Sequence, residues 1–421
     1  MRRSITISES RLSVVDVSVI EARLLNELGR SLASKVRFWK TSQDEPSARS
    51  VIRVTYDGAK WTVIVRNAVG MIRVGDLQIR VLPKIPMKHF IYLLSVGGNL
   101  PRFVRDDIMA TSSRDLLELV AHWFMTAVDG VLKRDLIRDY VEVNDHLRAA
   151  RGQMDALETG SLYYSGRLML SCRFDDLELN TPLNRILKAG ARIVSGNAGF
   201  TATLRRSAWR ILQRLDTVGD VMPGDLAARS DRRTEHYEDA LMLARLLIGG
   251  EARAIEFGEC SAWSFLIPTP DVVERSVRAV LVEALAPECA VTNRARALTP
   301  NFLKVNPDLV FEPALGVGDV KYKVNWDELP RAELYQVVSF AAAYHSNQAA
   351  LVSFKTDARK PLPDVHFGDT SVRHFYWDAR PDTPPAEAAD SFVGAVRTWL
   401  RDVCMHDVES NSYRFSQGVV S

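Results

Sequence analysis

The sequence carries almost no net charge and has few cysteines. It contains 54 Lys and Arg against 52 Asp and Glu, a formal net charge of +2. A polyanionic partner would therefore have to bind a local basic surface. The four cysteines are scattered, without a CxxC pair or histidines at zinc-finger spacing. This excludes a disulfide framework and a structural zinc site, and it favours a reducing compartment.

Long apolar runs are also missing. No uninterrupted apolar run approaches the roughly 20 residues that a membrane helix needs. The basic start, MRRSITISESRL, is not followed by the apolar segment of a signal peptide. We therefore expect a cytoplasmic protein that makes no contact with a membrane.

Several catalytic motifs are absent as well. There is no HExxH, no GxSxG and no glycine-rich dinucleotide loop after a strand, which disfavours the enzyme classes that use them. The phosphate-binding loop GxxxxGK[ST] is missing too. A nucleotide-driven motor would therefore have to be a second protein.

What is present is apolar material for more than one core: 47% of the 421 residues are hydrophobic and 25% are charged. The length and the changing periodicity predict a multidomain α+β protein. We expect an N-terminal α+β module (1–110), a mostly helical, arginine-rich middle domain (111–255), a C-terminal α/β domain (256–406) and a polar, frayed tail (407–421).

Within the N-terminal module, alternating apolar residues on both sides of Asp57-Gly58 predict a β-hairpin. Its strands are expected at 50–56 and 60–66. Other segments are expected to form a helix at 19–40, a strand at 76–82 and a short helix at 87–95.

The middle domain shows helical periodicity from Leu116 to Val128, with Ser112 or Ser113 as a possible N-cap. Further helices are expected at 181–196, 201–215 and 236–248. The arginines of this domain could approach phosphates, or equally cover helix surfaces and pair with acids. They include Arg148, Arg151, Arg167, Arg173, Arg185, Arg205, Arg206, Arg210 and Arg214.

The C-terminal domain alternates helices and strands in the order of an α/β sandwich. Its expected helices are 271–285, 331–344 and 391–403, and its expected strands are 307–311, 317–322, 349–354 and 372–377.

Two of these strands carry the strongest chemical pattern. Asp308 opens the first strand, and Asp319 and Lys321 lie on the second, where alternation places both side chains on one face. Paired as a hairpin, the two strands would bring Asp308 to the same face. The alternative is a half-exposed strand whose charges merely face solvent.

Two carboxylates with a nearby lysine are the groups that metal-dependent phosphodiester hydrolysis requires. Asp308 and Asp319 would hold Mg²⁺ or Mn²⁺, and Lys321 would orient or deprotonate the attacking water. Glu274, on the preceding helix, would be a further metal ligand, unless it is an ordinary solvent-facing carboxylate. Gln336, on the following helix, would support the site, unless it is a surface amide.

With these residues in view, the chain resembles the McrC family, the nuclease subunit of two-component McrBC systems. The nuclease-region motifs are Pro307-Asp308-Leu309-Val310, Asp319-Val320-Lys321-Tyr322-Lys323 and Leu334-Tyr335-Gln336. Upstream, Leu77 to Ile85, Leu147 to Gly152 and Asn180 to Arg185 are also similar to family motifs.

The resemblance implies a PD-(D/E)xK core of the restriction-endonuclease type, and a catalytic set of Asp308, Asp319, Lys321, Gln336 and Glu274. It implies a DNA endonuclease subunit that restricts DNA carrying 5-methylcytosine-type modification, with GTP bound only by a partner, an McrB-like AAA+ GTPase hexamer. The N-terminal module would contact and stimulate that partner.

Two alternatives remain open: a non-catalytic activator and scaffold of the GTPase, and a freestanding Mg²⁺-dependent nuclease. Lys84 and Arg80 are candidates for acting on the GTPase, although a structural role at the end of a strand is the preferred interpretation.

Overall fold

The computed structural model describes residues 3–33, 50–98, 100–101, 116–197, 199–257, 260–299, 303–313, 316–360 and 362–417. The chain forms two compact units. One contains residues 118–249, and the other combines residues 1–117 with residues 250–421.

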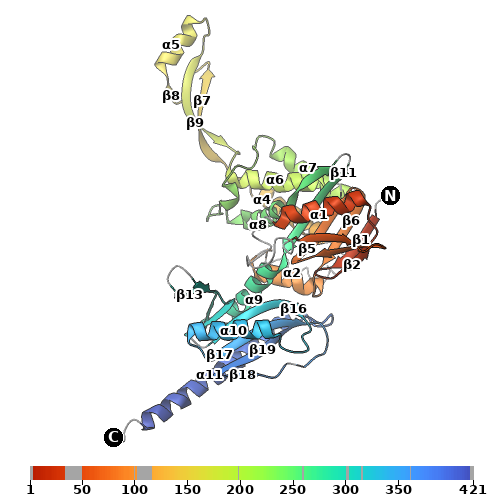
Figure 1. Cartoon of the computed structure of the whole chain (residues 1–421). Coiled ribbons are helices and arrows are strands. Elements are labelled where there is room, and N and C mark those ends of the chain that lie inside the picture. Colours follow the sequence, from red (N-terminus) through yellow and green to blue (C-terminus); the bar gives the residue numbers. More distant parts are fainter. Residues whose placement is uncertain are drawn as a thin grey trace. The chain divides into compact units, whose positions relative to one another are not determined.

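The N-terminal part of the larger unit is built on a five-stranded sheet with the order β1-β6-β5-β11-β10 (Figure 1). Its first three strands come from the N-terminal module, and of these only β6 was predicted. Strands β11 and β10 come from far along the chain and were not predicted either. Gly70 allows β11 to approach β5, because a Cβ there would lie 2.1 Å from the Phe265 carbonyl oxygen. The strands are β1 (Arg3–Ser8), β5 (Ala68–Val74), β6 (Leu77–Leu82), β10 (Glu251–Phe257) and β11 (Cys260–Pro268).

A second, three-stranded sheet has the order β2-β4-β3. The predicted hairpin is confirmed: Tyr56 pairs with Trp61 across a turn in which Gly58 has a φ of 94°. Helix α1 contacts β3, and its apolar face joins a common core with both sheets. The part of the predicted helix that follows Ala33 lies outside the described residues. The elements are β2 (Ser13–Val15), α1 (Val19–Ala33), β3 (Ile52–Tyr56), β4 (Trp61–Val65) and α2 (Met87–Val96).

The smaller unit combines a helical body with an arm (Figure 1). The helices of the body were predicted, although the expected N-cap at Ser112 or Ser113 lies outside the described residues. They are α4 (Leu116–Lys133), α6 (Pro182–Gly196), α7 (Ala202–Arg214) and α8 (Glu238–Gly250). The short 3-10 helices η3 (Asp225–Ala227) and η4 (Glu235–Tyr237) were not predicted as separate elements.

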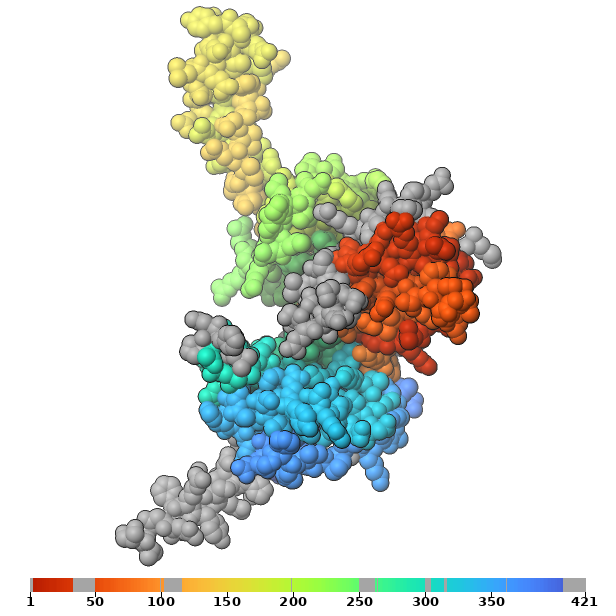
Figure 2. All heavy atoms as spheres, in the orientation of Figure 1, coloured from red at the N-terminus to blue at the C-terminus, as the bar shows by residue number. Residues whose placement is uncertain are grey.

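The arm is a three-stranded sheet with the order β7-β9-β8, and its one helix lies in sequence between β8 and β9. The sequence pattern did not predict this sheet. In Figure 2 the arm stands away from the helical body of its own unit. Large apolar side chains lie exposed on it, Leu157 at 90% and Tyr164 at 91% among them. Its elements are β7 (Asp139–Leu147), β8 (Gln153–Met154), α5 (Ala156–Tyr164) and β9 (Leu170–Glu178).

The motif from Asn180 to Arg185 is a structural junction of the helical body. The Thr181 hydroxyl caps α6 by accepting from the backbone N–H of Asn184. The buried Asn184 amide donates to the carbonyls of Ile137 and Leu179 and accepts from the Tyr237 hydroxyl. A buried amide with these partners fixes the helix in one position.

Several arginines of this unit pair with acids, one of the alternatives that the sequence left open. Arg185 makes two hydrogen bonds of 2.8 Å to Asp225, and both side chains are buried. Arg151 donates to Asp176 at 2.9 Å. Arg185 is therefore an internal structural residue and does not face phosphates.

The C-terminal part of the larger unit is a six-stranded mixed sheet with the order β12-β15-β16-β17-β19-β18. Helix α10 packs on β16, β17 and β19, and α9 contacts β16 and β12. The sheet strands are β12 (Ala290–Thr292), β15 (Leu309–Glu312), β16 (Gly316–Val324), β17 (Gln348–Lys355), β18 (Val365–Phe367) and β19 (Thr370–Asp378). A separate hairpin is formed by β13 (Arg296–Thr299) and β14 (Leu303–Val305), and the helices are α9 (Thr269–Leu285), α10 (Arg331–Tyr344) and α11 (Pro385–Gln417).

The predicted helices and strands of this part occur in the predicted order, with shifts at their ends, whereas β12, β13, β14 and β18 were not predicted. Helix α11 begins at Pro385 and continues to Gln417, so residues 407–417 are helical and not the frayed tail that was expected. In the described part of the chain, no helix combines the length and the apolar character that crossing a bilayer requires.

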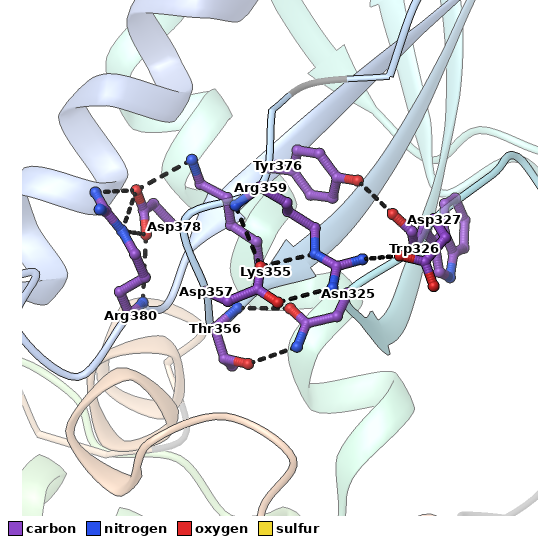
Figure 3. Close-up of polar contacts among 10 residues, drawn as sticks. All are labelled: Asn325, Trp326, Asp327, Lys355, Thr356, Asp357, Arg359, Tyr376, Asp378 and Arg380. Carbon is purple, nitrogen blue, oxygen red and sulfur yellow. Dashed lines mark hydrogen bonds and ion pairs between the residues drawn. The ribbon is translucent and has the colours of Figure 1, made fainter.

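A polar network ties the ends of the parallel strands β16, β17 and β19 together (Figure 3). Asn325, in the left-handed conformation at the end of β16, exchanges two hydrogen bonds of 2.8 Å with Thr356. Arg359 bridges Asp357 and Asp327. Asp378 is held between Lys355 and Arg380. These contacts fix the end of the strand that carries the candidate site.

Candidate active site

The hairpin of β15 and β16 brings the two predicted aspartates together. The strands pair antiparallel, with Leu309 opposite Gly318, as the sequence predicted. Asp308 lies in a bend just before β15 and not within the strand. Its Oδ2 accepts a 2.9 Å hydrogen bond from the backbone N–H of Val320. Asp308 is therefore anchored directly beside Asp319.

Asp319 is buried, with only 3% of its surface exposed. Burial raises the pKa of its carboxyl group to about 7; the nearby Lys321 ammonium opposes this effect and Asp308 adds to it. Lys321 Nζ lies 2.7 Å from Asp319 Oδ2. The alternative interpretation, a half-exposed strand whose charges face solvent, therefore does not apply to Asp319.

Lys321 joins the aspartates to helix α10. Its ammonium group also donates a 3.0 Å hydrogen bond to Oε1 of Gln336. Gln336 is exposed on α10, yet its amide reaches the site. The structure thus brings together four of the five predicted residues: Asp308, Asp319, Lys321 and Gln336.

A second ion pair lies beside these residues, and it was not predicted from the sequence. Lys323 Nζ contacts Oε1 of the buried Glu333 on α10. Burial acts to raise the pKa of Glu333, but its hydrogen bond with Lys323 and the nearby lysines lower it overall. The sequence contained the pattern for this pair. Lys323 follows Lys321 by two residues and so lies on the same face of the strand, and Glu333 precedes Gln336 by three residues and so lies on the same face of the helix.

Glu274 is buried on helix α9, so it is not an ordinary solvent-facing carboxylate. One helical turn later, Arg278 donates a 2.9 Å hydrogen bond to the backbone carbonyl of Asp308. Among the described residues, no group of three or more His, Cys, Asp or Glu side chains is arranged to hold a metal ion. The role of Glu274 as a metal ligand stays a prediction.

The Asp308 and Asp319 pair nevertheless suits a small divalent cation. Mg²⁺ binds through one or two carboxylates and completes its shell with water and substrate phosphates. Asp319 Oδ2 is buried and accepts no hydrogen bond of ordinary geometry; its neighbour is the Lys321 ammonium. A cation at this oxygen would favour the charged carboxylate that burial disfavours.

The raised pKa of Asp319 predicts how stability depends on pH without metal. An unfolded aspartate ionises near 3.8, whereas the native carboxyl keeps its proton up to about 7. Between these values the native state binds more protons, so the free energy of unfolding should fall as pH rises, by about 1.4 kcal/mol for each unit of pKa difference. Glu9, with its pKa raised to about 7 by burial, acts in the same direction.

Denaturant unfolding in EDTA between pH 4 and pH 8 measures this slope. Asp319→Asn should flatten it and should make the protein more stable than wild type at pH 8. The control Asp390→Asn changes an exposed carboxylate on α11 and should keep the wild-type slope. Equal slopes for all three proteins would contradict the burial of an ionisable Asp319.

Comparisons with known proteins agree on one group of relatives. Residues 63–353 match the family model described as McrBC 5-methylcytosine restriction system component. Comparison with curated proteins gives no significant match. The fold is similar to a chain of a half-complex from a tetradecameric assembly of Thermococcus gammatolerans McrB AAA+ hexamers with bound McrC, with a TM-score of 0.68 and 18% identity over 94% of this chain and 99% of that one.

A chain of the Thermococcus gammatolerans McrBC complex, solved by cryo-electron microscopy, is similar over a shorter length. The TM-score is 0.51 at 19% identity, over 67% of this chain and 88% of that one. At these identities the likeness concerns the fold.

Proposed function

The chain belongs to the family of McrBC 5-methylcytosine restriction system components, and from this premise we propose that it is the endonuclease subunit of a GTP-dependent restriction system. Its PD-(D/E)xK core would hydrolyse phosphodiesters of DNA that carries 5-methylcytosine-type modification. The observation that supports this proposal most is the buried Asp319 carboxyl group, which lies beside Asp308 with Lys321 Nζ 2.7 Å away.

In this mechanism Asp308 and Asp319 would hold Mg²⁺ or Mn²⁺, with Glu274 as a further proposed ligand. Such an ion would supply the positive charge that polarises a phosphoryl group and lowers the pKa of a water molecule. The Lys321 ammonium would orient the attacking water and offset the negative charge that develops at the phosphorus centre. Gln336 keeps the Lys321 ammonium in place through their hydrogen bond.

The partner in this proposal is an McrB-like AAA+ GTPase hexamer. The similar solved chain belongs to an assembly of McrB AAA+ hexamers with bound McrC. We propose that the N-terminal module, which exposes Leu12 and Val14, contacts this partner. The exposed apolar side chains of the arm form a second contact surface, because large exposed apolar sets mark interaction sites.

The arm surface can be tested with exposed residues that the fold does not need. The double variant Leu157→Ser, Tyr164→Ser should weaken binding to the partner GTPase about 10- to 100-fold and leave the melting temperature unchanged. Trp209→Ser, which alters an exposed aromatic residue on α7 outside the arm, is the matched control. If titration calorimetry shows that the double variant binds the partner GTPase with wild-type affinity, the arm is not a contact surface. The N-terminal module would then be the only proposed contact.

Plasmid cleavage tests the function as a whole. Wild-type protein with Mg²⁺ should cut modified DNA when the partner and GTP are present, and EDTA should stop the reaction. Cutting without the partner and GTP would instead identify a freestanding nuclease. Stimulation of GTP hydrolysis without any cutting would identify a scaffold.

Two cysteines fit the proposed cytoplasmic location. Cys172 and Cys289 are buried, free thiols, the state that a reducing compartment maintains.

A further inference from the structure

Four polar residues from distant parts of the chain meet inside the larger unit, away from Asp319. We call Glu9, Lys84, Thr269 and Tyr322 the Glu9 cluster. Glu9 follows β1 and Lys84 lies two residues beyond β6, so both belong to the N-terminal module. Thr269 is the first residue of α9, and Tyr322 lies on β16. The cluster therefore joins the N-terminal sheet to two elements of the candidate site.

Lys84 makes most of the contacts to β16. Its backbone N–H donates to the Tyr322 hydroxyl at 3.1 Å, and its ammonium group donates to the Tyr322 carbonyl, also at 3.1 Å. The same ammonium lies 4.9 Å from the centre of the Tyr322 ring and 4.0 Å from Glu9 Oε1. Lys84 thus contacts β16 with both its backbone and its side chain, which agrees with the structural role expected for it.

Glu9 stabilises the first turn of α9. Its Oε1 accepts a hydrogen bond from the hydroxyl of the fully buried Thr269. The Glu9 side chain has no exposed surface, and burial raises its pKa to about 7. Burying a carboxyl group beside an ammonium group costs stability unless their geometry is kept, so such a cluster is sensitive to any displacement of its members.

The two elements that the cluster holds are those that place the aspartates. Tyr322 is three residues from Asp319 on β16 and projects to the opposite face from Lys321. Helix α9 carries Arg278, which holds the Asp308 carbonyl at 2.9 Å. A shift of Lys84 or Glu9 would therefore move the supports of both carboxylates.

We propose that the Glu9 cluster positions β16 and α9 for metal binding, so that the N-terminal module is a structural part of the nuclease site. This inference rests on the proposed nuclease function. Lys84, Tyr322, Glu9 and Thr269 are positioning residues, because they act through the strand and the helix and do not touch the phosphodiester.

The test uses the full-length chain with Lys84→Met, which removes the ammonium contacts, and Tyr322→Phe, which removes only the hydroxyl. The control is Asn26→Ala, which breaks two hydrogen bonds between α1 and Val54 in the same module but does not involve β16. Mn²⁺ affinity is measured by electron paramagnetic resonance without DNA. Cleavage rate and KM for DNA are measured separately with the partner and GTP.

Lys84→Met should weaken Mn²⁺ binding and slow cleavage about 10- to 100-fold, the usual effect of losing a support behind a metal ligand, while KM for DNA stays within about twofold. Tyr322→Phe should also weaken Mn²⁺ binding and slow cleavage, by a smaller factor. Asn26→Ala should lower the melting temperature without changing Mn²⁺ affinity.

Unchanged Mn²⁺ affinity in Lys84→Met and Tyr322→Phe would overturn the proposal, as would an equal loss in Asn26→Ala. Hydrogen exchange of residues 316–324 in metal-free protein gives an independent measure. Hydrogen exchange of these residues should be faster in Lys84→Met and in Tyr322→Phe than in wild type, and unchanged in Asn26→Ala. Unchanged exchange in the two cluster variants would also overturn the proposal. If the wild-type protein binds Mn²⁺ but never cuts DNA, the proposed nuclease function is wrong, and the positioning role of the Glu9 cluster in metal binding is not affected.

Discussion

Replacing Asp319 with asparagine should lower the rate of DNA cleavage at least about 1,000-fold. The amide keeps the size of the side chain but cannot carry the negative charge that holds a divalent cation. Loss of the cation removes several kcal/mol of transition-state stabilisation, and each 1.36 kcal/mol corresponds to a factor of ten. Because Asp319 is buried beside Asp308, no solvent-exposed carboxylate can take its place.

The same variant separates the proposed function from the scaffold alternative. Stimulation of GTP hydrolysis by the partner should remain at the wild-type level, because the substitution leaves the arm and the N-terminal module unchanged. The measurements are plasmid cleavage and phosphate release in parallel, with Asp390→Asn, an exposed position on α11, as the control. Undiminished cleavage by Asp319→Asn would show that the site lies elsewhere.

Arg185→Met should lower the free energy of unfolding of the smaller unit by about 3–5 kcal/mol. Arg185 and Asp225 form a buried pair in which Nε and Nη2 of the guanidinium group each lie 2.8 Å from a carboxylate oxygen. Removing one member leaves the other charge buried without its partner, which costs far more than the pair gains. The guanidinium also satisfies the carbonyl of Asn180, a contact that methionine cannot make.

The control lies on the same helix. Arg192 pairs with Asp220 at 2.7 Å, but both side chains are more than half exposed. Arg192→Met should therefore cost no more than about 1 kcal/mol. Chemical denaturation of both variants, followed by a probe in residues 118–249, measures the difference, and equal losses would show that burial of the Arg185 pair contributes nothing.

Local sequence patterns were sufficient to predict most of the helices and two hairpins, that of β3 with β4 and that of β15 with β16. The Asp57-Gly58 turn and the alternation around Asp319 predicted their strands because the side chains of a strand alternate with a fixed period of two. The same period placed Asp319 and Lys321 on one face. Many other strands escaped prediction, among them β1, β5, β10, β11, β12, β18 and the sheet of the arm, because strand pairing depends on partners that lie far away in the sequence.

Burial and pairing could not be read from the sequence. An aspartate and a lysine two residues apart have the same pattern on an exposed strand and in an active site. The fold decides that Asp319 is desolvated with its pKa raised to about 7, and that Lys321 reaches Gln336. Likewise, Arg185 has the pattern of a phosphate contact, and only packing against Asp225 makes it structural.

By itself, therefore, the sequence determined the local elements, the strand face that carries Asp319 and Lys321, and the absence of a phosphate-binding loop of its own. The tertiary structure alone decided which groups lose their water and which distant residues meet, such as Lys84 with Tyr322 and Lys323 with Glu333. The physical reason is range: backbone periodicity is set by near neighbours along the chain, whereas desolvation and ion pairing depend on every element packed around a side chain.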